Sequence, residues 1–316
     1  MSTLTENVAK VTAAHAALKT AIAAKGVAVP EGTKLTGMPA LVGQISTEPE
    51  PTNPRASFAY DESASIVVPK TLVVDMMSVT NLANCFFQCS SLTSLHLPDG
   101  FGQNATTFAS CFFQCSSLTS LHLPDVFGQN ATSFDNCFSQ CSSLTSLHLP
   151  DGFGQNATSF AYCFFQCSSL TSLHLPDGFG QNATTFASCF YQCSSLTSLH
   201  LPDGFGQNAT SFAYCFYNCS SLTSLHLPDG FGQNATSFVR TFYNCTALKD
   251  ITGNPNFKIS FDLSPCPNLT HDSLMVVING LQTVTETQTL TLGTTNLAKL
   301  TDEEKKVATD KGWTLA

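Results

Sequence analysis

The sequence predicts an α/β solenoid, in which each coil of the chain holds one short parallel strand and one short helix. A block beginning CFFQCSSLTSLHLPDGFGQNATTFAS starts at Cys85 and returns every 26 residues, at Cys111, Cys137, Cys163, Cys189 and Cys215. A fixed period of this length is typical of repeat architectures. A unit this small cannot bury its apolar face alone, so we expect neighbouring units to stack around one continuous core.

The strand of each unit is predicted by the segment LTSLHL. Its apolar and polar residues alternate at its end, and the segment is expected to form a short strand with Leu92, Leu95 and Leu97 inward. A Pro-Asp-Gly sequence follows directly and predicts a turn.

The helix of each unit is predicted by the apolar residues that come after this turn. They lie at positions i, i+3, i+4 and i+7, which corresponds to one face of a helix, and in the second unit they are Phe108, Cys111, Phe112 and Cys115. The side chain of Asn104 or Thr106 is expected to cap the start of the helix.

The ends of the array differ from its middle, as a solenoid requires. We expect an N-terminal cap over residues 61–84, repeats over 85–252 and a C-terminal cap over 253–316. Within the last segment the sequence predicts a helix over about 271–284, a strand at TQTLTL and a final helix. Thr301 followed by Glu304 has the pattern of a capping box at the start of that final helix.

Residues 1–45 are predicted to form a separate helical module for attachment or oligomerisation. An apolar stripe recurs there at heptad spacing, through Leu4, Val8, Val11, His15, Leu18 and Ile22. The helix either packs on the segment GMPALVGQI or associates between chains, which would make the protein a homo-oligomer, with a trimer as one option. The Pro-rich residues 46–60 are expected to form a stiff linker.

Charge and hydropathy exclude several classes of protein. The 316 residues carry a formal net charge of −9, and neither Lys nor Arg occurs between Cys85 and Val239. A nucleic-acid binder needs clustered cations for its phosphate contacts, so this class is excluded. The chain has no apolar run of about 18 residues, which argues against membrane insertion. Its N-terminus also lacks the basic start and apolar core of a secretory signal.

The repeat itself resembles a known family. The pattern N-A-T-x-F-x-x-C-F-x-x-C-S-S-L-T-S-L-x-L is similar to the BspA-type leucine-rich repeats of bacterial surface proteins and phage tail proteins, over residues 73–252. Residues 16–45 look like an N-terminal module of tail-associated proteins of Firmicutes phages. The C-terminal segment resembles the cap of BspA-like proteins from Firmicutes and their phages.

This resemblance implies a leucine-rich-repeat solenoid that recognises a partner and catalyses no reaction. The implied partners are a glycan or protein of a bacterial surface and, through residues 1–45, other tail or particle proteins. The implied location is a virion or phage-tail-like particle assembled in the bacterial cytoplasm, with the extracellular cell surface as the alternative. The runner-up function is a bacterial adhesin, and a third is a purely architectural fibre.

The fourteen cysteines invite a metal-site hypothesis, but packing is favoured. Both cysteines of each Cys-x-x-x-Cys pair lie on the expected apolar face, where thiols behave as small hydrophobic groups. A zinc site needs four ligands that converge tetrahedrally. Disulfides between neighbouring coils are the second alternative. We therefore expect no metal and no cofactor.

Two exterior columns are candidate binding surfaces. The histidine column lies on the outer face of the strands, where it could be a solvated polar face, a ligand-binding strip or a transition-metal site. Adjacent imidazolium charges about 4.8 Å apart would repel and lower the histidine pKa values. Its members are His96, His122, His148, His174, His200 and His226.

The second column, the aromatic stripe, lies at the positions where the copies differ most. It is expected on the convex exterior, opposite the Phe and Cys face. Exposed aromatic residues in a row are typical of a contact surface, although drift at unconstrained positions would also vary the residues. The candidates are Phe113, Tyr162, Phe165, Tyr191, Tyr214, Tyr217, Arg240 and Tyr243. A six-fold repeated surface offers no unique catalytic constellation, so no catalytic residue is predicted.

Overall fold

The computed structural model of the chain describes residues 65–67 and 79–316. The predicted helical module at 1–45, the linker at 46–60 and most of the predicted cap at 61–84 lie outside the described residues. The boundaries proposed between these segments therefore stay predictions.

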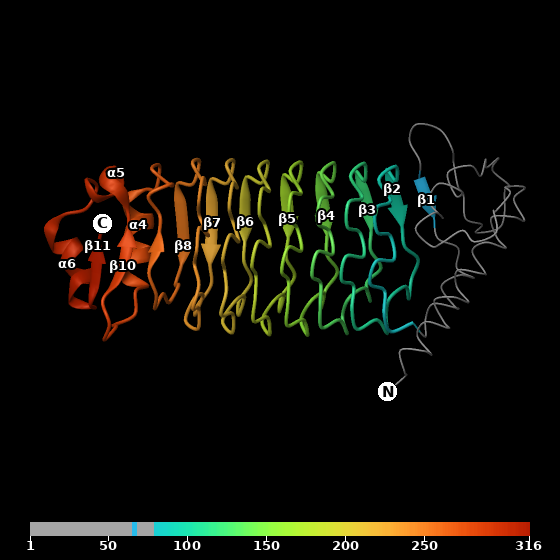
Figure 1. The fold of residues 1–316 in the computed structure, drawn as a ribbon, viewed down its shortest axis with the longest axis horizontal. Helices are drawn as coiled ribbons and strands as arrows, with labels where there is room; N and C mark the ends of the chain where they lie inside the picture. The colour runs from blue at the N-terminus through green and yellow to red at the C-terminus, as the bar shows by residue number, and fades with distance from the viewer. Residues whose placement is uncertain (1–64, 68–78) are drawn as a thin grey trace, which may run out of the picture.

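The repeats form a stack of coils in a nearly straight row (Figure 1). One short strand lies in each coil, and each strand pairs in parallel with a neighbour in register, so that Leu95 lies opposite Leu121. The strands are β1 (Ser65–Val67), β2 (Ser94–His96), β3 (Ser120–His122), β4 (Ser146–His148), β5 (Ser172–His174), β6 (Ser198–His200), β7 (Ser224–Leu227) and β8 (Asp250–Gly253). They hydrogen-bond in the groups β1-β2-β3, β4-β5 and β6-β7-β8.

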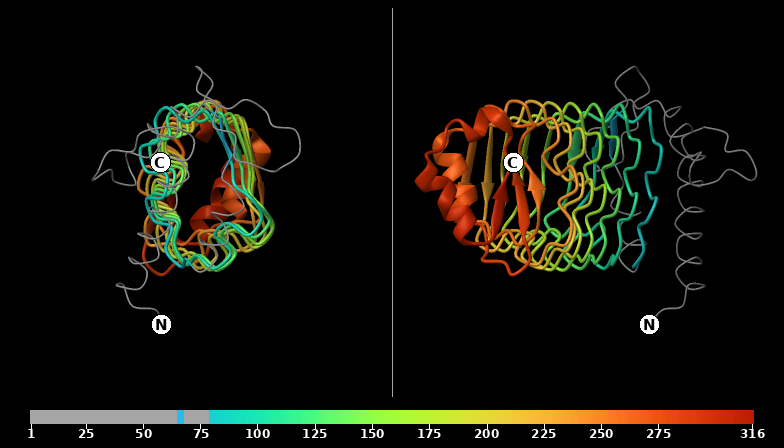
Figure 2. Two further views of the ribbon diagram at one scale, coloured as in Figure 1. Left: turned by 90° about the vertical axis from the view of Figure 1, so that its right-hand side faces the viewer. Right: turned by 60° about the vertical axis from the view of Figure 1, so that its left-hand side comes forward.

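A second line of pairing runs along the solenoid outside these strands. Parallel bridges join Thr107 to Ser133, then Ser133 to Ser159, and continue to Ser237. Viewed along the solenoid axis, the coils superpose as one outline (Figure 2). Each coil is therefore held to its neighbours along two separate lines, as stacked repeats require.

The predicted helix in each coil is wrong. Residues 108–115 form two consecutive β-turns, closed by hydrogen bonds from Cys111 N–H to Phe108 O and from Cys115 N–H to Phe112 O. The third residue of each turn has a positive φ, 55° at Ser110 and 57° at Gln114, as in a type II turn.

Hydrogen bonding between coils explains why turns replace the helix. The N–H groups of Ser110, Phe112 and Gln114 each donate 2.8 Å bonds to carbonyls of the next coil. An α-helix would direct its N–H groups to carbonyls four residues earlier in the same coil and leave none for the neighbour. Two four-residue turns also place their first and last residues inward, which reproduces the i, i+3, i+4, i+7 spacing of a helix.

The helix caps expected at the Asn-Ala-Thr segment are replaced by braces between coils. The N–H and the hydroxyl of Thr132 both bind Thr106 O of the preceding coil, at 2.8 and 3.1 Å. Asn130 Nδ2 donates to Gln103 O at 2.8 Å. These side chains satisfy backbone groups of a neighbouring coil because there is no helix terminus to cap.

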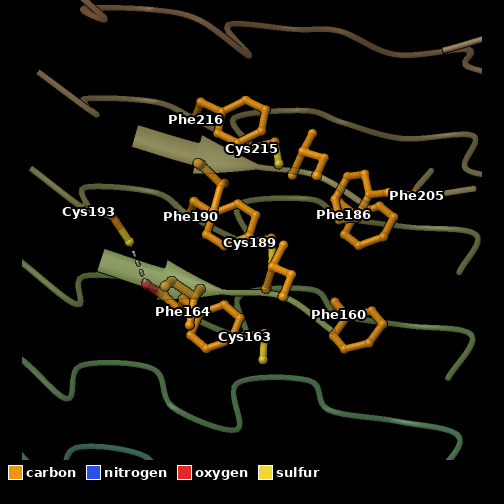
Figure 3. Close-up of a cluster of buried hydrophobic side chains, with 14 of the residues drawn as sticks. Phe160, Cys163, Phe164, Phe186, Cys189, Phe190, Cys193, Phe205, Cys215 and Phe216 are labelled. Atoms are coloured by element: carbon orange, nitrogen blue, oxygen red, sulfur yellow. Dashed lines mark hydrogen bonds between the residues drawn. The ribbon is translucent and has the colours of Figure 1, made fainter. Parts of the chain in front are cut away.

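Columns of phenylalanine rings fill the interior (Figure 3). Phe160 and Phe186 stack with centroids 5.6 Å apart at an interplanar angle of 1°, and Phe164 and Phe190 stack at 5.5 Å and 5°. All four rings are fully buried. The inward-facing Leu95 and Leu97, predicted from the alternation, are likewise buried.

The C-terminal segment closes the array with a mixed layer of helices and strands (Figure 2). Its helices are α4 (His271–Asn279), α5 (Gly293–Leu297) and α6 (Asp302–Asp310), and its parallel sheet has the order β11-β10-β9. The strands of that sheet are β9 (Phe261–Asp262), β10 (Gln288–Thr291) and β11 (Trp313–Leu315). The predicted capping box forms, with Thr301 and Glu304 each bonding the other's backbone N–H.

The cap also ends the ring columns. Phe257 meets Phe231 and Phe238 at 82° and 70°, and Trp313 meets Phe261 at 80°. Edge-on rings cover the last stacked faces without presenting a further face. Among the helices described here, none is long and apolar enough to cross a membrane.

Two glycines in one coil, Gly152 and Gly154, test the close packing of the turns. Gly154 and Gly152 have φ values of 72° and 77°, so an alanine is strained at either position by about 1–2 kcal/mol. At Gly154 an added Cβ would also lie 2.5 Å from Cζ of the buried Phe160, whereas at Gly152 the nearest atom is Cγ of Gln129 at 3.4 Å.

We expect Gly154→Ala to lower the free energy of unfolding by about 2–4 kcal/mol, because overpacking adds to the backbone strain. Gly152→Ala serves as the matched control and should show the backbone strain alone. Urea unfolding followed by circular dichroism measures both. Equal losses in the two variants would contradict the packing argument.

Candidate binding surfaces

The aromatic stripe is a set of stacked rings on the exterior. Phe165 and Tyr191 lie 4.7 Å apart at 13°, Tyr191 and Tyr217 4.6 Å apart at 2°, and Tyr217 and Tyr243 4.9 Å apart at 11°. Phe113 stacks on Phe87 at 5.0 Å. The predicted column therefore exists as a surface, although turns and not a helix place its residues there.

The other members of the stripe precede these stacked rings by three residues in the chain. They lie at the third residue of the first of the two β-turns in each coil. Tyr162 packs beside Phe165 at 5.6 Å and Tyr214 beside Tyr217 at 5.8 Å. The guanidinium carbon of Arg240 lies 5.8 Å from the ring centroid of Tyr243, within the range of a cation–π contact. Both predicted rows thus meet in one surface.

This surface contains strained backbone. Tyr162, Tyr214 and Arg240 have φ values of 58°, 57° and 50°, a region that bulky residues seldom adopt. Asn and Ser occupy the same position in other coils, and Asn tolerates it better. Strain of this kind, held by the surrounding structure, is a reason to look for function at the residues that carry it.

The stripe has one interruption. Ser139 replaces the ring between Phe113 and Phe165 and is 1% exposed. The surface therefore has an N-terminal pair of rings and a longer C-terminal stack of four, running from Phe165 to Tyr243.

The histidine column lies on the outer face of the strands, as predicted. His96 and His122 stack with centroids 4.3 Å apart, and His200 and His226 stack at 4.6 Å. Partial burial, followed by the adjacent His122, lowers the pKa of His96. A shallow groove of about 340 Å³ runs over this face, lined by Ser146, Leu147, His148, Ser172, Leu173, His174, Ser198 and His200.

Sequence reasoning missed a second groove. We call it the amide–serine groove: it has a volume of about 460 Å³ and is lined by Ser116, Gln140, Ser142, Gln166, Ser168, Gln192, Ser194, Asn218, Ser220 and Asn244. Every lining side chain is an uncharged amide or hydroxyl. The recurrence of Gln or Asn every 26 residues, directly before the second cysteine position of each unit, was the available signal, but a predicted helix would place these residues on an ordinary solvated face.

The cysteines pack as predicted. All fourteen are free thiols, thirteen of them buried. Cys193 Sγ donates to Phe164 O of the preceding coil at 3.2 Å (Figure 3), and where Thr241 replaces a cysteine its hydroxyl donates to Phe212 O at 2.8 Å. Burial raises the pKa of Cys167 to about 12, which disfavours the thiolate that metal binding requires. Residues 79–316 hold no cluster of three His, Cys, Asp or Glu side chains able to bind a metal.

Comparison with known proteins identifies the family to which the repeats belong. The sequence model of the BspA type Leucine rich repeat region matches six copies, over residues 55–183 and 160–270. The chain belongs to this family. Membership indicates repeat-based binding or a role at the cell surface. No curated protein matches the chain.

Solved leucine-rich repeat structures are similar to parts of the chain. A leucine rich repeat protein of T. pallidum is 19% identical, with a TM-score of 0.34, over 71% of this chain and 86% of that one. A leucine rich cell surface protein of Faecalibacterium prausnitzii is 17% identical, with a TM-score of 0.27, over 55% and 69%. A leucine-rich repeat protein of Bacteroides ovatus is 18% identical, with a TM-score of 0.22, over 74% and 80%.

Two histidines should titrate on opposite sides of the ordinary value of 6.5. Partial burial and His200 lower the pKa of His226. The hydrogen bond that His271 Nε2 donates to the Glu304 carboxylate, 2.8 Å away, raises the pKa of His271. As the pH falls through 6.5, the unfolded chain takes up a proton at residue 226 before the folded chain does, so this group then disfavours folding.

At His271 the sign is reversed. Its contribution to stability is fully present below the unfolded pKa and is lost as the pH rises through the higher folded pKa. NMR titration of the ring protons measures both groups, and His226→Gln and His271→Gln assign the two signals. Equal titration midpoints for the two rings would contradict the geometry.

Proposed function

We propose that this protein is a non-enzymatic recognition protein of a phage tail or tail-like particle, and that its solenoid attaches the particle to a bacterial surface. The observation that carries the proposal is the aromatic stripe, whose rings recur from coil to coil at 4.6–5.0 Å. A surface that repeats the same side chains is suited to a target that repeats as well.

The mechanism is multivalent binding by a rigid array. Once one coil engages a repeated target, the next contacts become intramolecular and raise the overall affinity without any new kind of contact. The coils are held in fixed positions by their shared hydrogen bonds, so little ordering is needed when the target binds.

Side-chain chemistry and backbone strain favour the aromatic stripe over the histidine column. Tyr162 and Tyr243 are 43% and 45% exposed, and aromatic side chains are enriched at the centres of protein interfaces. Tyr162 and Tyr214 also occupy a backbone conformation that Asn, present at this position in other coils, would adopt at lower cost. In this proposal the face that carries the histidine column stays solvated.

In this proposal, residues 1–45 attach the protein to the particle. The proposal rests on the heptad stripe of that segment and on the resemblance of residues 16–45 to a module of tail-associated proteins. Immunogold labelling of the bacterium that produces the protein tests the location: gold on particle tails supports it, whereas gold on the cell envelope would make the protein an adhesin.

Loss of three central rings of the aromatic stripe should weaken cell binding. We expect Phe165→Ala/Tyr191→Ala/Tyr217→Ala to weaken binding of the labelled chain to a susceptible bacterial strain by at least about tenfold, the usual loss for central aromatic contacts. The matched control is His148→Ala/His174→Ala/His200→Ala in adjoining coils, which should bind within about twofold of the original chain. Flow cytometry of labelled cells measures both.

The opposite ranking of these two variants would move the binding surface to the strand face. Unchanged binding in both would remove the support that the exterior columns lend to the proposed function. Circular dichroism confirms that each variant remains folded before binding is compared.

The helical module should control assembly. We expect the full chain to be a defined oligomer and the chain without residues 1–55 to be a monomer, as measured by light scattering after size exclusion. If the truncated chain still assembles, the aromatic stripe is a contact between solenoids, and the architectural function replaces recognition.

A further inference from the structure

We propose that the amide–serine groove binds a neutral polysaccharide chain laid along the axis of the solenoid. This inference rests on the proposed function and names both the site and the chemical class of its target. The groove crosses several coils, because its lining runs from Ser116 to Asn244. It lies beside the longer ring stack of the aromatic stripe, because each ring of that stack directly precedes an amide residue in the chain, as Tyr191 precedes Gln192.

The amides are held in place by one another. Gln88 donates to Gln114, Gln114 to Gln140 and Gln166 to Gln192, at 2.6–2.8 Å. A primary amide has two N–H donors and two acceptor lone pairs. An amide that uses one N–H and one lone pair in such a ladder keeps one N–H and one lone pair for a ligand. Its side chain is also already ordered before the ligand binds.

Sugar hydroxyls match these groups. Each hydroxyl both donates and accepts, so it can bond an amide N–H, an amide oxygen or a serine hydroxyl with equal ease. Successive coils are about 4.8 Å apart, which is close to the advance of one pyranose residue in an extended glycan.

The absence of charged side chains in the groove favours a neutral polymer. None of the ten lining residues is ionisable, and Lys and Arg are absent from residues 85–239. Phosphate, carboxylate or sulfate groups on an anionic polymer would therefore find no cation to pair with, although such pairs provide most of the affinity for charged polymers.

Backbone hydrogen bonding disfavours an extended peptide. A peptide that adds to a sheet edge needs free N–H and C=O groups. Here Gln140 N–H donates to Phe165 O, Gln166 N–H to Tyr191 O, and Gln192 N–H to Tyr217 O, each at 2.7 Å. The lining also offers no apolar pocket for peptide side chains, because all its residues are amides and serines.

The test begins with cells of a strain that the full chain binds. We expect mild periodate, which cleaves the vicinal diols of sugars, to abolish binding, and proteinase K to leave it intact. The neutral polysaccharide extracted from that strain should then compete with the cells. Loss of binding after proteinase K alone would overturn the glycan proposal while the proposed function stands.

Groove variants locate the site. We expect Ser142→Glu/Ser194→Glu, which places two charges in the groove, to weaken binding to the extracted polysaccharide by at least about tenfold through lost hydrogen bonds. The matched control is Ser146→Glu/Ser198→Glu, which adds the same charges to the same two coils on the exposed strand face and should bind within about twofold of the original chain. Equal effects of the two pairs would overturn the assignment of the groove.

A second variant covers the case in which the added charges unfold the chain. Gln166 and Gln192 have φ values of 57°, where glycine is favourable, so Gln166→Gly/Gln192→Gly removes two amides from a backbone that accepts the change. This variant should stay folded and lose polysaccharide binding. Full binding by it would overturn the proposal. If the original chain binds no bacterial strain, the proposed function is wrong, and the glycan proposal falls with it.

Discussion

Hydrogen bonds between coils are the constraint on which the rest of the structure depends. From Ser110 to Cys115, alternate N–H groups bond to the next coil, and those between them close turns within their own coil. This alternation requires a positive φ at Ser110 and Gln114, and it directs Phe112 and Cys115 inward. The aromatic stripe follows from the same alternation, since an outward residue of these turns lies next to its counterpart in the neighbouring coil.

The sequence predicted the strands and the inward leucines because alternation with period two has one structural meaning at that length. It failed at the helix because two four-residue turns and one helix place apolar residues at the same spacing. The period alone cannot distinguish a carbonyl acceptor four residues back from one in the next coil. Thr301 and Glu304 were predicted correctly because a capping box depends only on neighbouring residues.

The candidate surfaces also differ in whether the sequence could predict them. The histidine column could be located from the strand pattern, and the aromatic stripe from the variation among copies. The amide–serine groove could not, because its depth depends on the path of the turns and on amides that bond across coils, as Gln166 does to Gln192. The backbone strain at Tyr162 and Tyr214 is likewise a property of the turns, and no feature of the residue order indicates it.

The reach of the hydrogen bonds has a consequence for how such a chain changes over generations. The braces extend one coil back, as from Thr132 to Thr106 and from Asn130 to Gln103. Recombination between two near-identical copies that removes or adds one whole unit therefore rejoins matching partners, whereas loss of part of a unit separates the pairs that span the junction. Selection can thus adjust the length of the exposed surfaces in steps of one coil, while the two ends of the array stay the same.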